Sequence, residues 1–265
     1  MINRFIFTIL LLTLTLGASA QFINFGQSRA SIRWKQINTP DFQIIYPDFY
    51  EESAQHAARM FYRLYRHRNT LGTKARKISV VIHADGGIYN GNVALAPRKC
   101  ELYPMPTQEP GEHWLDHLCI HEFRHVTQFD KTRQGLTKGL SYLLGDIAPV
   151  AVMGVYLPMW FMEGDAVSFE TAVGHMGRGR SPEFLNEMKA QIVEKGLYSL
   201  HKAVLGSRVD YVPNRYNMGY YMTANTRRHY GSDVWAKAVQ RSGRRQASFG
   251  QLTNHKRNID TSSRR

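Results

Sequence analysis

The chain has 265 residues, of which 43% are hydrophobic, and a formal net charge of +13 at pH 7. This length is sufficient for one domain with a sizeable core or for two closely joined lobes. Two cysteines are too few for a disulfide-linked scaffold, which excludes the small, disulfide-rich class of secreted proteins.

The first twenty residues have the pattern of a secretory signal peptide. Arg4 provides the charged end, Phe5 to Leu16 the apolar core, and Ala18-Ser19-Ala20 the small-residue cleavage site. The apolar run is too short for a comfortable membrane span. We therefore expect cleavage after Ala20, a mature chain that begins at Gln21, and a periplasmic or secreted location.

The basic charge has a different meaning in an exported protein than in a cytosolic one. It favours contact with anionic envelope surfaces, acidic polymers or acidic partners, and we expect no nucleic acid partner. A basic solvated surface without a specific partner is an equally good interpretation. We expect no transmembrane span in the mature chain.

The segment after the signal peptide predicts strands and one helix. Ser31 to Ile37 and Phe42 to Tyr46 alternate apolar and polar residues around Thr39-Pro40-Asp41, which is typical of a β-hairpin or two short strands. Phe49 to Leu71 has the apolar periodicity of a helix. Ile78 to His83 is nearly all apolar, which indicates a central strand.

Two glycine-containing stretches follow that strand. Asp85-Gly86-Gly87 and Asn90-Gly91-Asn92 are predicted as turns. Val93 to Leu102 is predicted as an edge strand that comes shortly before the next helix.

The helix predicted at Trp114 to Asp130 contains His121-Glu122-Phe123-Arg124-His125. His121 and His125 lie one helical turn apart, so both imidazoles point the same way and can share one metal ion. Glu122 lies beside them, where a carboxylate can hold and deprotonate a metal-bound water. The flanking apolar residues indicate that the helix packs in a core, where buried polar groups need partners. The stretch predicts a metal site of the zinc-hydrolase type.

Neither cysteine is expected to bind this metal. Cys119 precedes His121 by two residues, about 200° round the helix, and therefore points away from the site. Cys100 and Cys119 could instead form a disulfide in an oxidising compartment.

The next segment is short of charge. Gly135 to Asp146 is predicted as a short helix, and Ile147 to Met162 runs for 16 residues without a charged side chain. That run is shorter than the roughly 20 residues of a membrane-spanning helix, and two prolines and a glycine interrupt it. We interpret it as a buried or membrane-touching hairpin that leads into a helix at Trp160 to Val173.

Two kinds of residue are common as the third protein ligand of such zinc sites. A longer motif that ends in a third histidine is excluded, because its later positions here are Gln128 and Lys131. Trp160-Phe161-Met162-Glu163-Gly164-Asp165-Ala166 instead resembles the Trp-x-x-Glu-Gly-x-Ala segment of glutamate-liganded zinc peptidases such as aminopeptidase N. The resemblance implies Glu163 as the third ligand.

The two motifs together resemble the peptidase MA-like, gluzincin-type domains of secreted bacterial proteins. The resemblance covers roughly residues 34–230 and is carried by residues 114–130 and 160–170. It implies an α+β, zincin-like fold with an N-terminal mixed β-sheet lobe, the active-site helix, and a mainly helical C-terminal lobe. Many relatives continue into propeller repeats, which this sequence lacks.

The remaining chain predicts helices. Ser181-Pro182-Glu183 has the residues of a helix start, and that helix is expected to end near Lys195. A loop at 210–213 and helices at 217–230, 232–241 and 246–254 should follow. We expect a single domain over residues 21–255, with a sheet lobe at about 21–110, a helical lobe at about 111–255, and a basic tail at 256–265.

The resemblance implies a zinc-dependent peptidase. One Zn²⁺ would be bound by His121, His125 and Glu163, and Glu122 would act as the general base. Aminopeptidases of this group recognise the free amine through an upstream Gly-x-Met-Glu-Asn segment. That segment is missing from this sequence, so we expect an endopeptidase acting on a peptide or protein substrate.

Two further acidic residues lie on the ligand helix. Glu170 shares a face with Glu163 and could hydrogen-bond a ligand histidine, which would set its tautomer, or replace Glu163 as the ligand. Asp165 has a similar but weaker claim to support a ligand. Of the two glutamates, the motif favours Glu163.

Substrate groups are expected from both lobes. Zincin folds carry an antiparallel edge strand to which a substrate backbone adds, and we expect Val93, Ala94, Leu95 and Ala96 to serve this role, with an ordinary sheet edge as the alternative. A side chain of the helical lobe should stabilise the oxyanion. We select Tyr220, although no motif distinguishes it from the other candidates: Tyr216, Tyr221 and His229.

Two functions without turnover compete with the peptidase. The chain could be a non-catalytic zinc-binding envelope scaffold or assembly module. The presence of Glu122 argues against a site that has lost its catalytic activity. The chain could also bind an envelope surface through its basic face, which would be sensitive to salt and indifferent to chelators.

Overall fold

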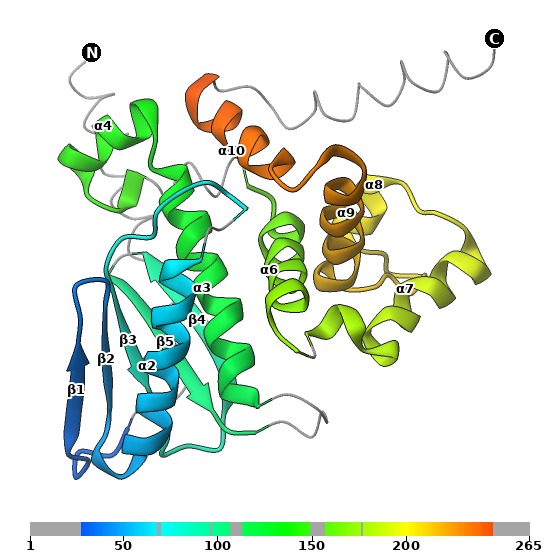
Figure 1. Ribbon diagram of the computed structural model, residues 1–265. Coiled ribbons are helices and arrows are strands. Elements are labelled where there is room, and N and C mark those ends of the chain that lie inside the picture. Colours follow the sequence, from blue (N-terminus) through cyan, green and yellow to red (C-terminus); the bar gives the residue numbers. More distant parts are fainter. Residues whose placement is uncertain are drawn as a thin grey trace, which may run out of the picture.

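The structure is a computed structural model that describes residues 28–67, 70–95, 97–106, 113–148, 157–175 and 177–245. The expected signal peptide, the expected helix at 246–254, the basic tail, Ala96 and residues 149–156 of the expected hairpin lie outside these residues. The described chain is α+β, as predicted (Figure 1). Among these residues, no helix is both long enough and apolar enough to cross a membrane.

A five-stranded mixed sheet forms the N-terminal part. Its strands are β1 (Trp34–Asn38), β2 (Phe42–Pro47), β3 (Ile78–Ile82), β4 (Tyr89–Leu95) and β5 (Arg98–Pro104), in the spatial order β1-β2-β3-β5-β4. The outer pairs β1/β2 and β4/β5 are antiparallel, whereas β2/β3 and β3/β5 are parallel. The predicted hairpin and the predicted central strand are therefore confirmed, and β4 is an edge strand.

The prediction for residues 90–102 was wrong in two respects. Asn90-Gly91-Asn92 is not a turn but lies in β4, opposite Tyr103, Leu102 and Glu101 of β5. The expected single strand at 93–102 is two strands, because the chain reverses between Leu95 and Arg98. Ladder hydrogen bonds to β5 outweigh the local turn preference of Asn and Gly.

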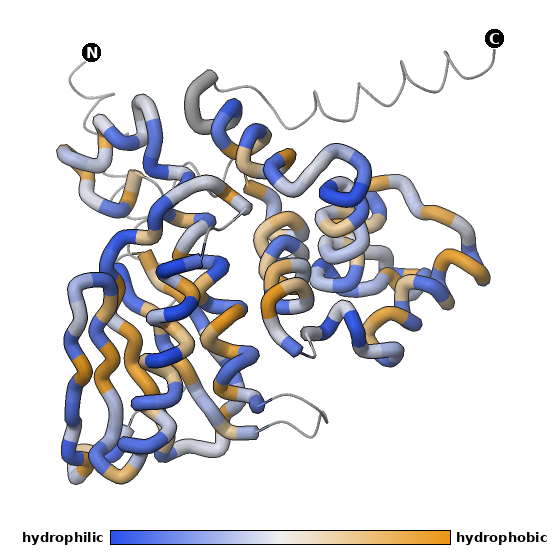
Figure 2. Tube along the Cα trace, in the orientation of Figure 1, coloured by the Kyte–Doolittle hydropathy of each residue, from blue (hydrophilic) through white to orange (hydrophobic). Residues whose placement is uncertain are grey.

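Two helices cover one face of this sheet. A short 3₁₀ turn (Asp48–Tyr50) leads into α2 (Glu51–Arg66), and α3 spans Trp114–Thr132. Apolar side chains of α2 and α3 pack on those of β2, β3 and β5, and the hydrophobic positions run along these strands (Figure 2). Helix α2 ends five residues before the predicted Leu71, because His67 adopts an extended conformation with φ −78° and ψ 139°.

The remaining elements are helical. They are α4 (Gly135–Leu144), α6 (Met159–Val173), a 3₁₀ turn (Arg178–Arg180), α7 (Pro182–Lys195), α8 (Leu200–Leu205), α9 (Arg215–Tyr230) and α10 (Val234–Arg245). Ser181 caps α7 by accepting from the Phe184 N–H, as its sequence predicts. Helix α8 is an addition that the periodicity did not reveal.

Two glycines set the approach of α6 to α9. A Cβ added at Gly164 would lie 2.0 Å from the backbone carbon of Gly219, and one added at Gly219 would lie 1.9 Å from the Trp160 carbonyl oxygen. Only glycine at both positions allows the two backbones to pack at this distance. The contact therefore joins α9 closely to the helix that carries Glu163.

We expect Gly219→Ala to lower the free energy of unfolding by at least about 2 kcal/mol, because the added methyl group overlaps the α6 backbone. Gly139→Ala is the matched control on a helix, because nothing lies within 4 Å of its added Cβ. The control should be neutral or stabilising by up to about 1 kcal/mol. Urea denaturation of both variants checks this, and equal stability of the two would contradict the packing argument.

Candidate metal centre

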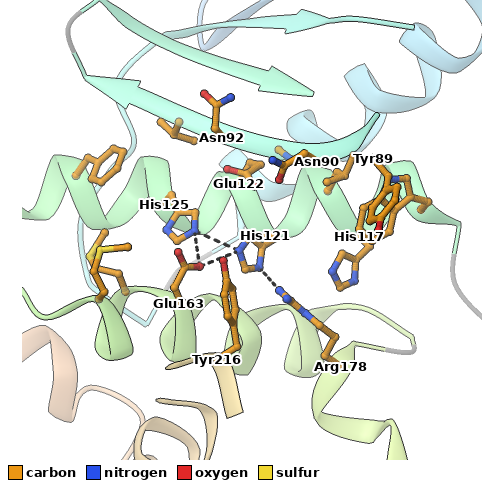
Figure 3. Close-up of a pocket in the computed structure, with 17 residues that line it drawn as sticks. Tyr89, Asn90, Asn92, His117, His121, Glu122, His125, Glu163, Arg178 and Tyr216 are labelled. Atoms are coloured by element: carbon orange, nitrogen blue, oxygen red, sulfur yellow. Dashed lines mark hydrogen bonds and ion pairs between the residues drawn. The ribbon is translucent and has the colours of Figure 1, made fainter. Parts of the chain in front are cut away.

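Two helices bring three predicted ligands together. Helix α3 provides His121 and His125, and α6 provides Glu163 (Figure 3). The two Nε2 atoms are 3.2 Å apart, and Glu163 Oε2 lies 3.5 Å from His121 Nε2 and 3.4 Å from His125 Nε2. All three side chains are at least 88% buried. The packing of α6 on α3 thus brings Glu163 next to the two histidines, although it lies far from them in the sequence.

These separations suit a tetrahedral zinc ion. Zinc bonds to imidazole nitrogen and carboxylate oxygen are about 2.0–2.1 Å long, so two ligand atoms of a tetrahedral ion lie about 3.3 Å apart. The three observed separations of 3.2, 3.4 and 3.5 Å lie close to that value. The donor set, two imidazoles and one carboxylate, is also one that zinc accepts while keeping a position open.

The proton of His125 is directed away from this centre. Gln128 donates through Nε2 to the Met162 carbonyl and to Asp165, which turns its Oε1 toward His125. Gln128 Oε1 lies 2.8 Å from His125 Nδ1, so Nδ1 carries the proton when His125 is neutral. The Nε2 lone pair is then free for a metal.

His121 is oriented in the same way by Glu170. Glu170 Oε2 lies 2.7 Å from His121 Nδ1, and Arg178 Nη2 lies 2.9 Å from both atoms. A guanidinium can only donate and a carboxylate can only accept, so the pairing that satisfies all three groups has Nδ1 donating to Glu170. The Nε2 lone pair of His121 therefore also faces the centre, beside Glu163 Oε2.

Without a metal, the centre attracts protons. Burial raises the pKa of Glu163, but the neighbouring imidazoles of His121 and His125 outweigh it and lower the pKa below its usual range. Burial likewise lowers the pKa of His125, but Glu163 outweighs it and raises the pKa to about 9. A positive charge is therefore needed between the three ligand atoms, supplied either by a proton or by a metal ion.

The structure distinguishes the two glutamates of α6. Glu163 faces both Nε2 atoms, whereas Glu170 lies behind His121 on its Nδ1 side. Glu170 is fully buried, and burial raises its pKa, but Arg178 and His121 outweigh this effect and hold the pKa well below its usual range. Arg178 satisfies both carboxylate oxygens, through Nε at 2.8 Å and Nη2 at 2.9 Å. Glu170 thus lies where it can orient His121, and Glu163 lies where it could bind a metal ion.

Asp165 reaches the centre only through another side chain. Its carboxylate accepts from Arg124 of α3, from Arg227 of α9 and from Gln128, and it contacts neither histidine of the motif. The expected support of a ligand by Asp165 is therefore indirect, through Gln128 to His125. Asp165 and Arg124 are both fully buried.

Glu122 lies at the wall of the cavity. Its Oε2 is buried and has no hydrogen-bond partner, and burial raises its pKa above the usual value. A Cβ added at Gly91 of β4 would lie 2.5 Å from Glu122 Oε1, so the edge strand passes directly over this carboxylate. The absence of a side chain at Gly91 leaves space for the Glu122 carboxylate.

A cavity of about 460 Å³ opens onto these residues. Strand β4 lines one side through residues 89–93, and Tyr216 and Arg178 lie on the other (Figure 3). Met162 also lines the cavity. Of the expected substrate-strand residues that the structure describes, Val93 lines the cavity and Ala94 and Leu95 do not. The segment that does so begins four residues earlier than predicted, because Asn90-Gly91-Asn92 is strand and not turn.

The structure places Tyr220, the selected oxyanion residue, away from the cavity. The Tyr220 hydroxyl donates to the Gly179 carbonyl at 3.3 Å, and Tyr220 does not line the cavity. Tyr216, one helical turn earlier on α9, does line it, and its ring lies 6.5 Å from that of His121. Sequence reasoning could not distinguish them, because the rotation of α9 is set by its contact with α6.

Two residues of the centre were not predicted. Gln128 lies three residues after His125, a spacing that places both on one helix face and could have identified it. Arg178 follows a glycine outside any predicted helix, and no pattern in the sequence marks it. Cys100 and Cys119 are free, buried thiols, and Cys119 packs in the core between helix and sheet.

No protein-family model, no curated protein and no solved structure matches this chain. Membership of the peptidase MA-like group therefore stays a prediction from the two motifs. The function has to be argued from the geometry and chemistry of the residues themselves.

Asp165→Asn should lower the free energy of unfolding by about 3–5 kcal/mol, because it leaves the buried Arg124 without its charge partner. Asp233→Asn, which breaks an exposed pair with Lys237, is the matched control and should leave the unfolding midpoint nearly unchanged. Thermal and urea unfolding measure both. A small effect of Asp165→Asn would show that the pair contributes little.

Zinc binding should release protons and become tighter as the pH rises. The pKa of His125 is raised to about 9, so below that pH the metal-free imidazole holds a proton that zinc must displace. Between pH 6 and 8 we expect the zinc affinity to rise about tenfold per pH unit for each proton released. Titration calorimetry in buffers of different ionisation enthalpy measures the proton count. A pH-independent affinity would contradict this ligand set.

Proposed function

We propose that this chain is a zincin-like, zinc-dependent peptidase that is exported from the cell. The observation that carries the proposal is the convergence of three potential ligand atoms, at tetrahedral separations, next to the unpartnered carboxylate oxygen of Glu122. Two imidazoles, one carboxylate and an adjacent acid are the groups that zinc-dependent hydrolysis of an amide needs.

His121, His125 and Glu163 would hold the ion, which supplies Lewis acidity and lowers the pKa of a bound water. Glu122 accepts the proton of the attacking water and returns it to the nitrogen of the leaving amine. Its raised pKa suits this exchange, because a carboxylate that is too acidic would not hold the proton between the two steps. Glu170 and Gln128 keep both imidazoles in the required tautomer.

Tyr216 is the residue best placed to stabilise the oxyanion. Its hydroxyl points toward the three ligand side chains (Figure 3). Burial raises the pKa of Tyr216, so the hydroxyl keeps its proton and can donate at neutral pH. Arg178 and Arg215 lie over its ring at 5.0 and 5.5 Å from the centroid.

Strand β4 is proposed to hold the substrate backbone. It is the outer strand of the sheet, it pairs only with β5 among the described strands, and it lines the cavity above Glu122. An extended peptide can add to such an edge with its main chain. The residues of β4 that line the cavity carry no acidic group to hold a free amine, which favours an endopeptidase over an aminopeptidase.

The test is cleavage of a mixed peptide library by the mature protein beside Glu122→Gln with the same zinc content. We expect the wild type to cleave and a chelator to stop it, whereas the variant should lose about 10²–10⁴-fold in rate. Equal zinc in both proteins without cleavage by either would favour the zinc-binding scaffold. Activity that survives in the variant would mean that Glu122 is not the base.

Tyr216→Phe is expected to lower kcat by about 10²-fold with little change in KM, because the hydroxyl acts on charge that develops in the transition state. Tyr220→Phe is the matched control on the same helix, and its hydroxyl bonds to Gly179 instead. Steady-state kinetics on the best library peptide compares them. A larger loss in Tyr220→Phe would return the role to the residue first predicted.

A further inference from the structure

A second group of metal-binding side chains lies at the beginning of α3. It consists of His56 from α2, together with His113 and Asp116 from the start of α3. His56 Nε2 lies 2.5 Å from Asp116 Oδ1, and His113 Nδ1 lies 4.0 Å from the same oxygen. None of the three lines the cavity of the central site.

The core fixes the two helix positions that carry His56 and Asp116. His56 is followed by the buried Ala57 on α2, and Asp116 is preceded by the buried Leu115 on α3. Ala57 and Leu115 belong to the same hydrophobic cluster, which packs α2 against α3 and the sheet. The pairing of His56 with Asp116 therefore follows from the packing of the two helices and not from a flexible surface.

The third side chain can adjust. His113 is the N-cap residue of α3, its side chain is 63% exposed, and its ring packs against that of His56 with centroids 5.4 Å apart. A tetrahedral ion needs ligand separations of about 3.3 Å, so the 4.0 Å separation must shorten and the 2.5 Å separation must lengthen when an ion binds. The side chains of His113 and His56 are 63% and 38% exposed, so both imidazoles have room to turn.

We propose that His56, His113 and Asp116 bind a second divalent ion of the imidazole-preferring transition metals, the class that includes Zn²⁺. Two imidazoles and a carboxylate suit that class better than Mg²⁺ or Ca²⁺, which prefer oxygen ligands throughout. The ion ties α2 to the first turn of α3, the helix that carries the central ligands. It binds more weakly than the central ion, because its ligands are more exposed and less evenly spaced.

A third combination of side chains does not compete for this ion. His117, His121 and Glu170 also lie close together, but Arg178 already fills the space between Glu170 and His121 and bonds both carboxylate oxygens. A second cation at that point would meet the guanidinium charge. Within the described ranges, a second ion would therefore report on the group at the start of α3.

The experiment counts zinc ions on the full mature chain, prepared without a polyhistidine tag and freed of metal. Zn²⁺ alone is added, and equilibrium dialysis with elemental analysis gives the stoichiometry. We expect two ions on the wild type and one on His56→Ala/His113→Ala. The matched control is His201→Ala/His229→Ala, which removes two exposed histidines elsewhere and should keep two ions.

The converse variant isolates the second site. His121→Ala/His125→Ala removes the central site and should still bind one Zn²⁺, with an unfolding midpoint that rises as Zn²⁺ is added. If that variant does not fold, the comparison of wild type with His56→Ala/His113→Ala decides alone. One ion on the wild type, or two on His56→Ala/His113→Ala, would overturn the second site.

These outcomes are independent of the proposed peptidase. Two bound ions without peptide cleavage would contradict the proposed peptidase activity and support the second metal site. If the protein holds one ion and cleaves peptides, and only replacement of His121 and His125 abolishes cleavage, the peptidase proposal is supported and the second metal site is contradicted.

Discussion

The structure depends on how the negative charges of three buried carboxylates on α6 are balanced. Glu163, Asp165 and Glu170 are all at least nine-tenths buried, and α6 carries no cation of its own. Leaving a buried carboxylate without a positive partner is costly, so each must recruit one from another element. Asp165 recruits Arg124 and Arg227, and Glu170 recruits Arg178.

Glu163 is the exception among the three. Among the residues that the structure describes, no arginine forms an ion pair with it, and its two ion-pair neighbours are imidazoles whose Nδ1 protons are directed elsewhere. The same helix thus has two carboxylates whose charge the protein neutralises and one whose charge it leaves for an ion. This difference supports a metal at Glu163 more strongly than the motif alone, because it follows from where the cations of the fold lie.

The compensation also explains how the elements are arranged. The arginine pairs of Asp165 join α6 to α3 and α9, and the pair of Glu170 fixes the turn after α6. The close contact of Gly164 with Gly219 then allows α9 to approach, which brings Tyr216 to the cavity. Support of the proposed centre and cohesion of the helical part therefore come from the same contacts.

The sequence by itself determined the elements that local patterns specify: the hairpin, the central strand, the helices α3, α6 and α7, and the alignment of His121 with His125 one turn apart. Helical and strand periodicity are local properties, so one segment is sufficient to reveal them. Only the tertiary structure decided the course of β4 over Glu122, the position of Tyr216 rather than Tyr220 at the cavity, and the ion pair of Arg178 with Glu170. Each of these depends on contacts between segments far apart in the chain, where ladder pairing, helix rotation and buried charge outweigh local preference.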